Sequence, residues 1–490
     1  MSVSAPPRPP APVRGADAGV ILGEQPIRRP DTRSPKVMTR RAWWLVALNF
    51  LVPGSAQVLA GNRRLGRVGL AATLLMWVLV VLTLVASLVW PTLIVDLGVN
   101  GFVLLVVQLV LLAYAVLWVV LTVDTLRLVR LVKTRPGARP LVAVTAILGL
   151  VLGSGGAVYA AQQLLAPARE ALASIFTNNA PPVPPSNGYY NILLLGADSG
   201  LGRDSMRFDS ISVVSVNADT GAVHITGIPR DLAHVPFSAG PMQDLYPDGL
   251  EGHISQTCGW GPGINQLMNA VEVCREDRGS GLYPDAAANS STPAIEATKD
   301  AAEGILGIEI PYYAFVDMKG FADIVDALGG VDITVQERLP KGGGPAYDGQ
   351  SAEDWAIGWI EAGPQHMDGD TAQWYARSRY TTSDADRMRR QRELQQAILA
   401  QANPANVLTR FQEVAAAGED LVQTDIPSSL LGFFVNLAVK AKDQPVQTLE
   451  LTLDGAGIDT DKPTPEAYAH VRELIQQALY PPSPTPTPEG

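Results

Sequence analysis

Long uncharged stretches dominate the first third of the chain. Three of them exceed the roughly 20 apolar residues that a helix needs to cross a bilayer. We therefore expect membrane spans near residues 68–90, 101–123 and 141–165. A fourth stretch, near residues 42–60, is broken by Pro53-Gly54 and several polar residues, so it is predicted to be a re-entrant hairpin, with a fourth span as the alternative.

The charged segments around these stretches predict an orientation. Residues 1–41 are rich in Pro and Arg and lack apolar periodicity, which is typical of a disordered basic arm. Basic residues also gather in residues 63–67 and 124–139, whereas residues 91–100 carry only Asp96. Because positively charged loops stay in the cytoplasm, we expect a multi-pass protein of the cell membrane whose chain beyond about residue 166 is extracytoplasmic.

The second half of the chain has the pattern of a folded α/β domain. A proline-rich linker is expected at 167–188, the domain at 189–480 and a proline-rich tail at 481–490. β-branched and apolar runs predict strands at Tyr190–Gly196, Ile211–Val216, Val223–Ile228, Tyr313–Val316, Val331–Val335 and Thr448–Leu453. Helical periodicity is found at Asn265–Arg275, Ala294–Leu306, Phe321–Leu328, Arg387–Ala402, Ser428–Lys440 and Pro465–Leu479. Strands with interspersed helices favour an α/β fold, built as an α/β/α layered domain.

Charge separates the two halves. Residues 1–165 hold 16 Lys and Arg against 5 Asp and Glu, whereas residues 166–490 hold 21 against 43. This split argues against a simple soluble enzyme and against nucleic-acid binding by the acidic half. The only two cysteines, Cys258 and Cys274, fall in the half predicted to lie outside, where thiols oxidise. We expect them to form a disulfide, with two free thiols as the alternative.

A cluster of arginines is the strongest local signal for chemistry. Six arginines fall within sixteen residues, at positions 377, 379, 387, 389, 390 and 392. On a helix whose apolar stripe runs through Leu394 and Ile398, Arg387 and Arg390 project within about 40° of Leu394. Buried charge must be neutralised. Two partners are possible: a salt-bridge network with Asp384 or other carboxylates, or a bound anion such as phosphate.

A second group of polar residues lies at predicted strand ends. Asp198 follows the first strand, Arg207 and Asp209 precede the second, and Arg230-Asp231 follow the third. Ligands of α/β sheets bind at such ends, and carboxylates with phosphate oxygens suit Mg²⁺, although each Asp alone could be a turn residue. The many apolar residues late in the chain could form core or a lipid groove. No zinc-like histidine spacing, nucleophile elbow or phosphate loop is found.

Seven short motifs in order give these residues a family context: Asn191–Asp198, Arg207–Ser210, Ile228–Asp231, Val316–Phe321, Val325–Val331, Tyr375–Arg379 and Asp384–Gln391. Together they resemble the LytR-CpsA-Psr family of cell-envelope proteins. The resemblance covers about residues 190–400. It implies an α/β/α domain with a central mixed sheet, and an activity: transfer of a glycopolymer from a polyprenyl-pyrophosphate carrier onto peptidoglycan by a membrane-bound phosphotransferase.

The resemblance also implies roles for individual residues. Asp198 and Asp209 match positions that hold Mg²⁺, with Mn²⁺ as a possible substitute. The positions that line the pyrophosphate are matched by Arg207, Arg230, Arg377, Arg379, Arg387, Arg390 and Gln391. The residues expected to carry the catalysis are Arg207, Asp209, Arg230, Asp231, Arg377, Arg379, Asp384 and Arg387. Asp231 is expected either to position the arginines or to accept the hydroxyl proton, and we favour positioning.

The sequence departs from the family at three points. Gly263 stands where a Lys often precedes the Ile-Asn pair, Ser199-Gly200 stand where an Arg is common, and several membrane segments replace a single anchor. Three other functions compete with the transferase: a polyprenyl-pyrophosphate hydrolase, a non-enzymatic module that binds envelope polymer or lipid, and a transcriptional attenuator. The predicted topology argues against the attenuator.

Overall fold

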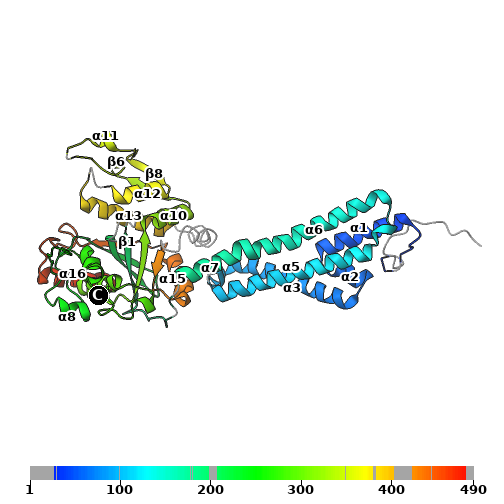
Figure 1. Ribbon diagram of the computed structural model, residues 1–490, viewed down its shortest axis with the longest axis horizontal. Coiled ribbons are helices and arrows are strands. Elements are labelled where there is room, and N and C mark those ends of the chain that lie inside the picture. Colours follow the sequence, from blue (N-terminus) through cyan, green and yellow to red (C-terminus); the bar gives the residue numbers. More distant parts are fainter. Residues whose placement is uncertain are drawn as a thin grey trace, which may run out of the picture. The chain divides into compact units, whose positions relative to one another are not determined.

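The computed structural model describes most of the chain, and that part divides into two compact units (Figure 1). The described residues are 27–28, 30–98, 100–176, 178, 180–197, 207–347, 349–378, 382–401, 422–442 and 444–481. The first unit comprises residues 1–85 and 107–162, and the second comprises residues 86–106 and 163–490.

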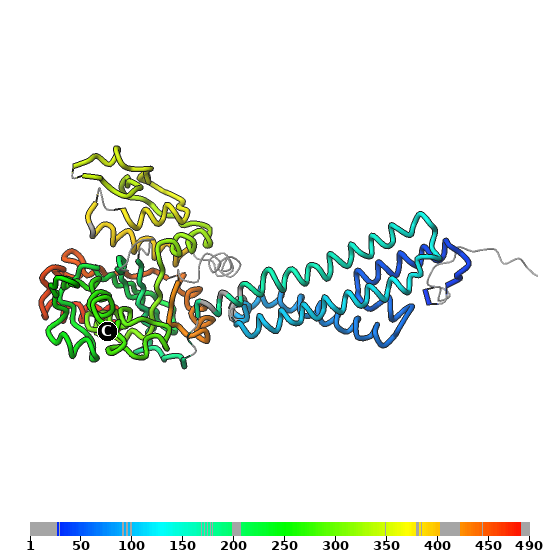
Figure 2. The backbone as a smooth tube through the Cα atoms, in the orientation of Figure 1, coloured from blue at the N-terminus to red at the C-terminus, as the bar shows by residue number. Residues whose placement is uncertain are grey.

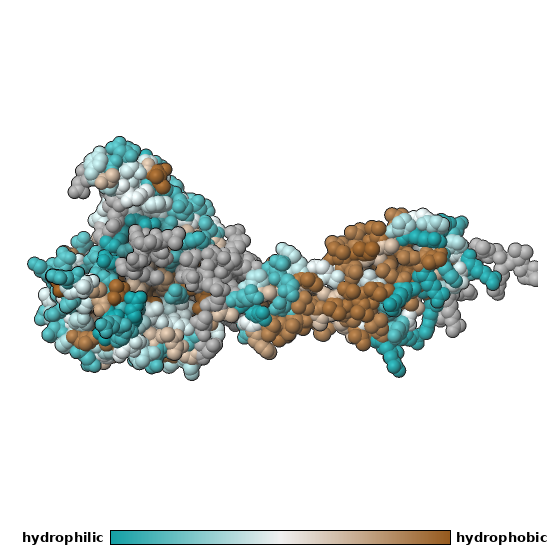
Figure 3. Space-filling model, in the orientation of Figure 1, coloured by the Kyte–Doolittle hydropathy of each residue, from teal (hydrophilic) through white to brown (hydrophobic). Residues whose placement is uncertain are grey.

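The first unit is helical. Its elements are α1 (Pro35–Leu51), α2 (Ser55–Ala60), α3 (Arg63–Val89), α5 (Gly101–Val129), the 3-10 turns η1 (Leu131–Lys133) and η2 (Pro136–Ala138), α6 (Arg139–Tyr159) and the π-helix η3 (Ala160–Leu165). The last residues of α3 and the first residues of α5 are assigned to the second unit, together with α4 (Pro91–Gly98), which joins these two helices. Three helices, Arg63–Val89, Gly101–Lys133 and Pro136–Leu165, are long and apolar enough to cross a membrane. Their outward faces carry exposed apolar side chains (brown in Figure 3).

Helices α1 and α2 form a hairpin that bends at Pro53-Gly54. Gly54 has a left-handed φ of +97°, and a Cβ there would lie 2.3 Å from the backbone nitrogen of Leu70. Asn49 and Gln57, on opposite sides of the bend, donate side-chain hydrogen bonds to one turn of α5: Asn49 to Thr122 Oγ1, and Gln57 to Leu121 O and Thr125 Oγ1. The chain therefore reverses at the bend. Helix α1 begins at Pro35, so the last residues of the predicted basic arm are helical.

The second unit contains a six-stranded mixed sheet in the order β10-β3-β2-β1-β4-β9. The strands are β1 (Tyr189–Ala197), β2 (Phe208–Asn217), β3 (Val223–Ile228), β4 (Tyr312–Asp317), β9 (Val422–Thr424) and β10 (Gln447–Glu450). β1–β2, β2–β3 and β4–β9 pair antiparallel, whereas β1–β4 and β3–β10 pair parallel.

Helices cover both faces of this sheet, which confirms the predicted α/β/α layers. On one face, Leu193 and Leu195 of β1 share a core with α9 (Pro293–Leu306) and α16 (Pro465–Leu479). The C-terminal helix, red in Figure 2, lies beside the green α9. On the other face lie α13 (Asp384–Gln401) and α15 (Leu431–Ala441). The shorter helical elements are α7 (Ala166–Ile175), α8 (Pro241–Leu245), η4 (Ile264–Gln266), η5 (Asn269–Val273), η6 (Ala287–Asn289) and η7 (Ser428–Leu430).

Residues 318–401 build a smaller lobe with its own core. It contains α10 (Met318–Leu328), α11 (Ala352–Trp355), α12 (Gly369–Arg377), α13 and two two-stranded sheets, β5 (Val331–Val335) with β8 (Gly363–Met367) and β6 (Leu339–Lys341) with β7 (Gly358–Ile360). Val325, Val331, Met367, Tyr375 and Leu394 are buried together there. Helix α13 thus belongs to this lobe while it also lies over the central sheet.

Two further predicted segments differ in part from the structure. The helix expected at Asn265–Arg275 is present but irregular: Ile264–Gln266 is a 3-10 turn and Asn269–Val273 is a π turn, closed by Cys274 N, which donates to Asn269 O. The predicted linker at 167–188 includes α7, and Val183 N donates to Tyr312 Oη at 2.7 Å. Part of that linker is therefore attached to the domain.

Candidate functional site

The Asp209–Arg230 pair lies at one end of the central sheet. Because β2 and β3 run antiparallel, with Ile211 opposite Ile228, the start of β2 and the turn after β3 are neighbours. Arg230 Nη1 lies 2.5 Å from Asp209 Oδ1, and Arg230 Nε lies 3.4 Å from Asp231 Oδ2. Both side chains of the Asp209–Arg230 pair are about one-quarter exposed or less. The structure therefore brings together three of the residues predicted at strand ends.

Asn265 supports this group and was not among the predicted site residues. Its Nδ2 donates to Asp231 Oδ1 at 3.1 Å, and its backbone nitrogen donates to Arg230 O at 3.0 Å. Asp231, whose side chain is 56% exposed, is thus bound through both oxygens. The sequence did offer one signal for Asn265, because the Ile264-Asn265 pair matches a pair found in the family that the sequence resembles.

The segment that carries Asn265 is closed by a disulfide. Cys258 and Cys274 are bonded, as predicted, with their Cα atoms 5.6 Å apart. Two residues between these cysteines contact the preceding turn: Pro262 O accepts from His234 N, and Gly263 pairs with Ala233 in an isolated bridge. The disulfide-closed loop therefore packs directly against the turn that follows Arg230-Asp231.

The arginines of α13 point inward, as the helical geometry predicted. Arg387, Arg390 and Arg392 are 5%, 2% and 4% exposed. Arg392 Nε lies 3.0 Å from Glu450 Oε1 on β10, and burial lowers the pKa of this arginine while it raises the pKa of Glu450. Arg389 is half-exposed and pairs with Glu393 at 2.7 Å and with Asp386 at 3.5 Å on its own helix. Carboxylates of the protein thus neutralise the charges of Arg389 and Arg392.

Arg390 has different partners. Its guanidinium donates to the backbone carbonyls of Tyr375 and Ser378 and to Thr382 Oγ1, and burial lowers its pKa. Its neighbour Gln391 donates through Nε2 to Ala376 O at 3.4 Å. Arg390 was expected to line the pyrophosphate, but in the structure its guanidinium already donates hydrogen bonds to protein oxygens.

Of the remaining predicted site residues, the structure describes the side chains of Arg377 and Arg207. Arg377 is the last residue of α12, half-buried, with its guanidinium 5.4 Å from the ring of Trp374. Arg207 is exposed just before β2. Asp198, Arg379 and the side chain of Asp384 lie outside the described residues.

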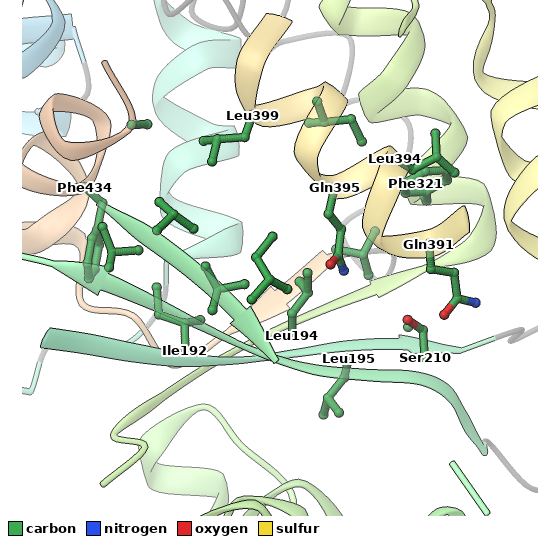
Figure 4. A pocket seen from close by; sticks show the side chains of 18 of the residues that line it. Ile192, Leu194, Leu195, Ser210, Phe321, Gln391, Leu394, Gln395, Leu399 and Phe434 are labelled. Atoms are coloured by element: carbon green, nitrogen blue, oxygen red, sulfur yellow. The ribbon is translucent and has the colours of Figure 1, made fainter. Parts of the chain in front are cut away.

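Helix α13 lies over strand β2, which begins at the Asp209–Arg230 pair. Gln395 Nε2 lies 3.3 Å from Ser212 Oγ of β2, and one turn earlier Gln391 lies near Ser210 (Figure 4). One helical turn advances about 6 Å, as do two residues of a strand. Continuing this register by one turn, we expect Arg387 to lie over the start of β2, where Asp209 is found.

A cavity of about 520 Å³ opens between the sheet and α13 and α15. Its sheet wall and helical wall are apolar (Figure 4), lined by Ile192, Leu194, Val214, Val216, Val223, Ile225, Leu394, Ile398, Leu399, Leu431, Phe434 and Leu437. Ser210, Asp317, Gln391 and Gln395 are its polar lining residues, and Ser210 and Gln391 adjoin the arginine site. Phe176, just after α7, also lines it. The late apolar residues thus line a cavity as well as forming core.

The described residues hold no group of three or more His, Cys, Asp or Glu side chains that could bind a metal by themselves. Of the predicted metal pair, Asp209 alone is described. Its Oδ1 accepts from Arg230, while its Oδ2 accepts no hydrogen bond from the described part of the chain. Since Mg²⁺ often binds through one or two carboxylates plus substrate phosphates, this residue suits a substrate-assisted site.

Known proteins are similar to about half of this chain. A transferase named polyisoprenyl-teichoic acid–peptidoglycan teichoic acid transferase TagU, from Bacillus cereus strain AH820, is 27% identical over 238 residues, which cover 48% of this chain and 60% of the relative. Biofilm regulatory protein A of Streptococcus mutans is 25% identical over 276 residues, 55% of this chain and 58% of that protein. The chain thus spans about 60% of these relatives' length.

A solved structure and a family model also match part of the chain. The crystal structure of B. subtilis TagV aligns with a TM-score of 0.39 and 20% identity, over 60% of this chain and 98% of that one. The model of the LytR_cpsA_psr family matches residues 162–244 and 287–475, more than half of the chain. The chain is therefore a member of the LytR-CpsA-Psr family.

Proposed function

We propose that this protein transfers a glycopolymer from a polyprenyl-pyrophosphate carrier onto peptidoglycan. The observation that carries the proposal is the meeting of two chemistries: the arginine-rich end of the sheet adjoins an apolar cavity at Ser210 and Gln391. A lipid pyrophosphate needs both, because its charged head requires fixed cations and its prenyl chain requires a water-free cavity. Relatives such as B. cereus TagU carry the name of this activity.

The reaction breaks a phosphoanhydride bond and forms a phosphoester bond. A sugar hydroxyl of peptidoglycan attacks the phosphorus that bears the glycopolymer. The bond from that phosphorus to the bridging oxygen breaks, polyprenyl phosphate leaves, and a phosphodiester forms while the hydroxyl gives up its proton. Such a transfer depends mainly on positioning and on charge stabilisation, so it needs no protein nucleophile.

The cationic residues have separate tasks in this scheme. Arg230, Arg377 and Arg387 bind phosphate oxygens and stabilise the charge that develops during transfer. Asp209 holds Arg230 through Oδ1 and, together with Asp198, would hold Mg²⁺ or Mn²⁺. When bound, the metal ion neutralises phosphate charge. Asp231 acts as a positioning group, because Asn265 and Arg230 bind its two oxygens.

The membrane anchor fits this substrate. Three helices are long and apolar enough to anchor the chain in a membrane. We place the second unit outside the cell, because basic residues gather in residues 63–67 and 124–139 and because a disulfide favours an oxidising compartment. The lipid carrier and peptidoglycan are then on the same side as the arginine site.

The test uses the full-length protein in detergent with a synthetic polyprenyl-pyrophosphate oligosaccharide, Mg²⁺ and peptidoglycan fragments. We expect polyprenyl phosphate to be released and the sugar to appear on peptidoglycan, with both lost in Asp209→Ala and Arg387→Ala. Release without sugar transfer would indicate hydrolysis, with water as the acceptor. Tight binding without release, unaffected by Asp209→Ala, would indicate a binding module.

A further inference from the structure

The C-terminal end of α12 is closed by a side chain from another helix. A helix leaves its last carbonyl groups without intrahelical donors, and its C-terminus carries partial negative charge. At the end of α12, Trp374 O accepts from Ser378 N at 2.9 Å. Tyr375 O accepts from Arg390 Nε at 3.0 Å, and Ser378 O accepts from Arg390 Nη2. Arg390 of α13 thus caps α12.

The same guanidinium also reaches the start of its own helix. Arg390 Nη1 donates to Thr382 Oγ1 at 3.1 Å, two residues before α13 begins. Gln391 supplements the cap through Ala376 O. A planar guanidinium presents donors in several fixed directions, so one arginine can join both helix ends where a lysine ammonium could not.

Burial separates Arg390 from the other arginines of the site. It is 2% exposed and ranks among the largest fully buried side chains of the described residues. Each of its three nitrogens already donates to protein oxygen. Arg230, in contrast, retains 20% of its side-chain exposure, and Arg377 is half-buried. A phosphate could reach those two residues without opening the fold.

Arg377 lies between the two capped carbonyls. It is the last residue of α12, with Tyr375 two positions before it and the cap residue Ser378 directly after it. The direction in which its side chain leaves the helix therefore depends on how firmly this terminus is held. We propose that Arg390 is a positioning residue, which fixes the end of α12 so that Arg377 faces the substrate pyrophosphate, and which itself binds no phosphate. This inference rests on the proposed function.

A double-mutant cycle tests the proposal. The affinity of the full-length protein in detergent for geranylgeranyl pyrophosphate is measured with Mg²⁺ for wild type, Arg390→Met, Arg377→Ala and the double variant. We expect Arg390→Met to weaken binding about tenfold and to add nothing when Arg377 is already alanine, because coupled residues are not additive. Fold-changes that multiply in the double variant, or an unchanged affinity in Arg390→Met, would overturn it.

Two further variants keep the cycle decisive. Arg389→Met is the matched control, since Arg389 neighbours Arg390 on α13 but pairs only with Asp386 and Glu393 among described residues; its affinity should equal that of wild type. Arg390→Lys retains the charge and can keep one carbonyl contact. It therefore replaces Arg390→Met in the cycle if the methionine variant does not fold. Its smaller loss of affinity should likewise vanish in the Arg377→Ala background.

Hydrogen exchange separates this inference from the proposed function. In Arg390→Lys, the amides of residues 375–378 should exchange faster than in Arg389→Met, with no ligand present, because the end of α12 frays. Unchanged exchange there would overturn the cap. If wild type bound no isoprenyl pyrophosphate at all, the proposed substrate would fail, and the exchange experiment would still decide whether Arg390 holds the terminus.

Discussion

At the scale of single residues, the charge of Asp209 is the first prediction. Its carboxylate lies 2.5 Å from Arg230 Nη1. Asp209→Asn keeps the shape but removes the charge that orients Arg230, so turnover should fall roughly 10²- to 10³-fold. Stability should change by about 1 kcal/mol or less, because the pair is partly exposed. Asp219→Asn, at the other end of β2, is the control, and an equal loss of turnover there would contradict the argument.

A second prediction at this scale concerns Asp300. Burial raises the pKa of its carboxyl to about 6, although Tyr283 Oη donates a hydrogen bond to it at 2.5 Å. Between about pH 4 and 6 the unfolded chain releases a proton that the folded chain keeps, so the free energy of unfolding should fall as pH rises through this window, then level off. Asp300→Asn should lack this decline. Denaturant unfolding at stepped pH values checks it, and parallel curves would contradict it.

The site was predictable at the residue scale wherever side-chain position follows from periodicity. The 100° spacing of a helix was sufficient to predict that Arg387 and Arg390 face inward, and their burial confirms it. The partners of Arg390 were not predictable, because backbone carbonyls at a helix end leave no mark in the sequence. Asn265 was missed for a related reason: its contact with Asp231 depends on a loop conformation, not on a pattern.

At the scale of elements, helix α13 is held to β10 by the buried Arg392–Glu450 pair. Removing one member leaves the other charge buried alone, which costs about 3–5 kcal/mol. Arg392→Met should therefore lower the free energy of unfolding by about that amount. The double variant Arg392→Met with Glu450→Met should recover most of it, since no lone charge remains. Equal losses in the single and double variants, measured by denaturant unfolding, would show that the pair does not anchor the helix.

Helix α15 offers a second test at this scale, directed at the cavity. Phe434 lines it, whereas the adjacent Phe433 is 38% exposed and is not among the lining residues. Phe434→Asp should weaken binding of geranylgeranyl pyrophosphate about tenfold or more, because a carboxylate is introduced where the prenyl chain lies. Binding of inorganic pyrophosphate should not change. Phe433→Asp is the matched control, and equal effects of both substitutions on the prenyl ligand would count against the cavity as its site.

The elements that could be predicted are those with enough length to show a period. Strands β1, β2, β3 and β5 follow β-branched or apolar runs and were found where expected. Strands β6, β7 and β9 have three residues each, too few for any alternation to appear. The helix predicted at Asn265–Arg275 was found as a 3-10 turn and a π turn, an irregularity that apolar spacing does not reveal.

At the scale of the whole molecule, the depth of the α1–α2 hairpin bears on how the chain crosses the membrane. Thr73 Oγ1 donates to Pro53 O at the bend and also lies 3.0 Å from Tyr114 Oη. Thr73 is ten residues into α3, and Tyr114 is near the middle of α5. The bend is therefore level with the middle of two candidate spans. Since α1 and α2 both return from it to the same side, this arrangement favours a re-entrant hairpin over a fourth span.

A re-entrant hairpin, combined with the basic residues at 63–67 and 124–139, predicts that the N-terminal arm and the loop between α5 and α6 lie inside the cell and the second unit outside. Both native cysteines are joined in a disulfide, so an introduced cysteine provides the one thiol available for labelling. Gly343→Cys, in the small lobe, should react with a membrane-impermeant maleimide on intact cells. Thr32→Cys and Gly137→Cys should react only after the cells are opened. Labelling of Thr32→Cys on intact cells would mean that residues 42–60 cross the membrane as a fourth span.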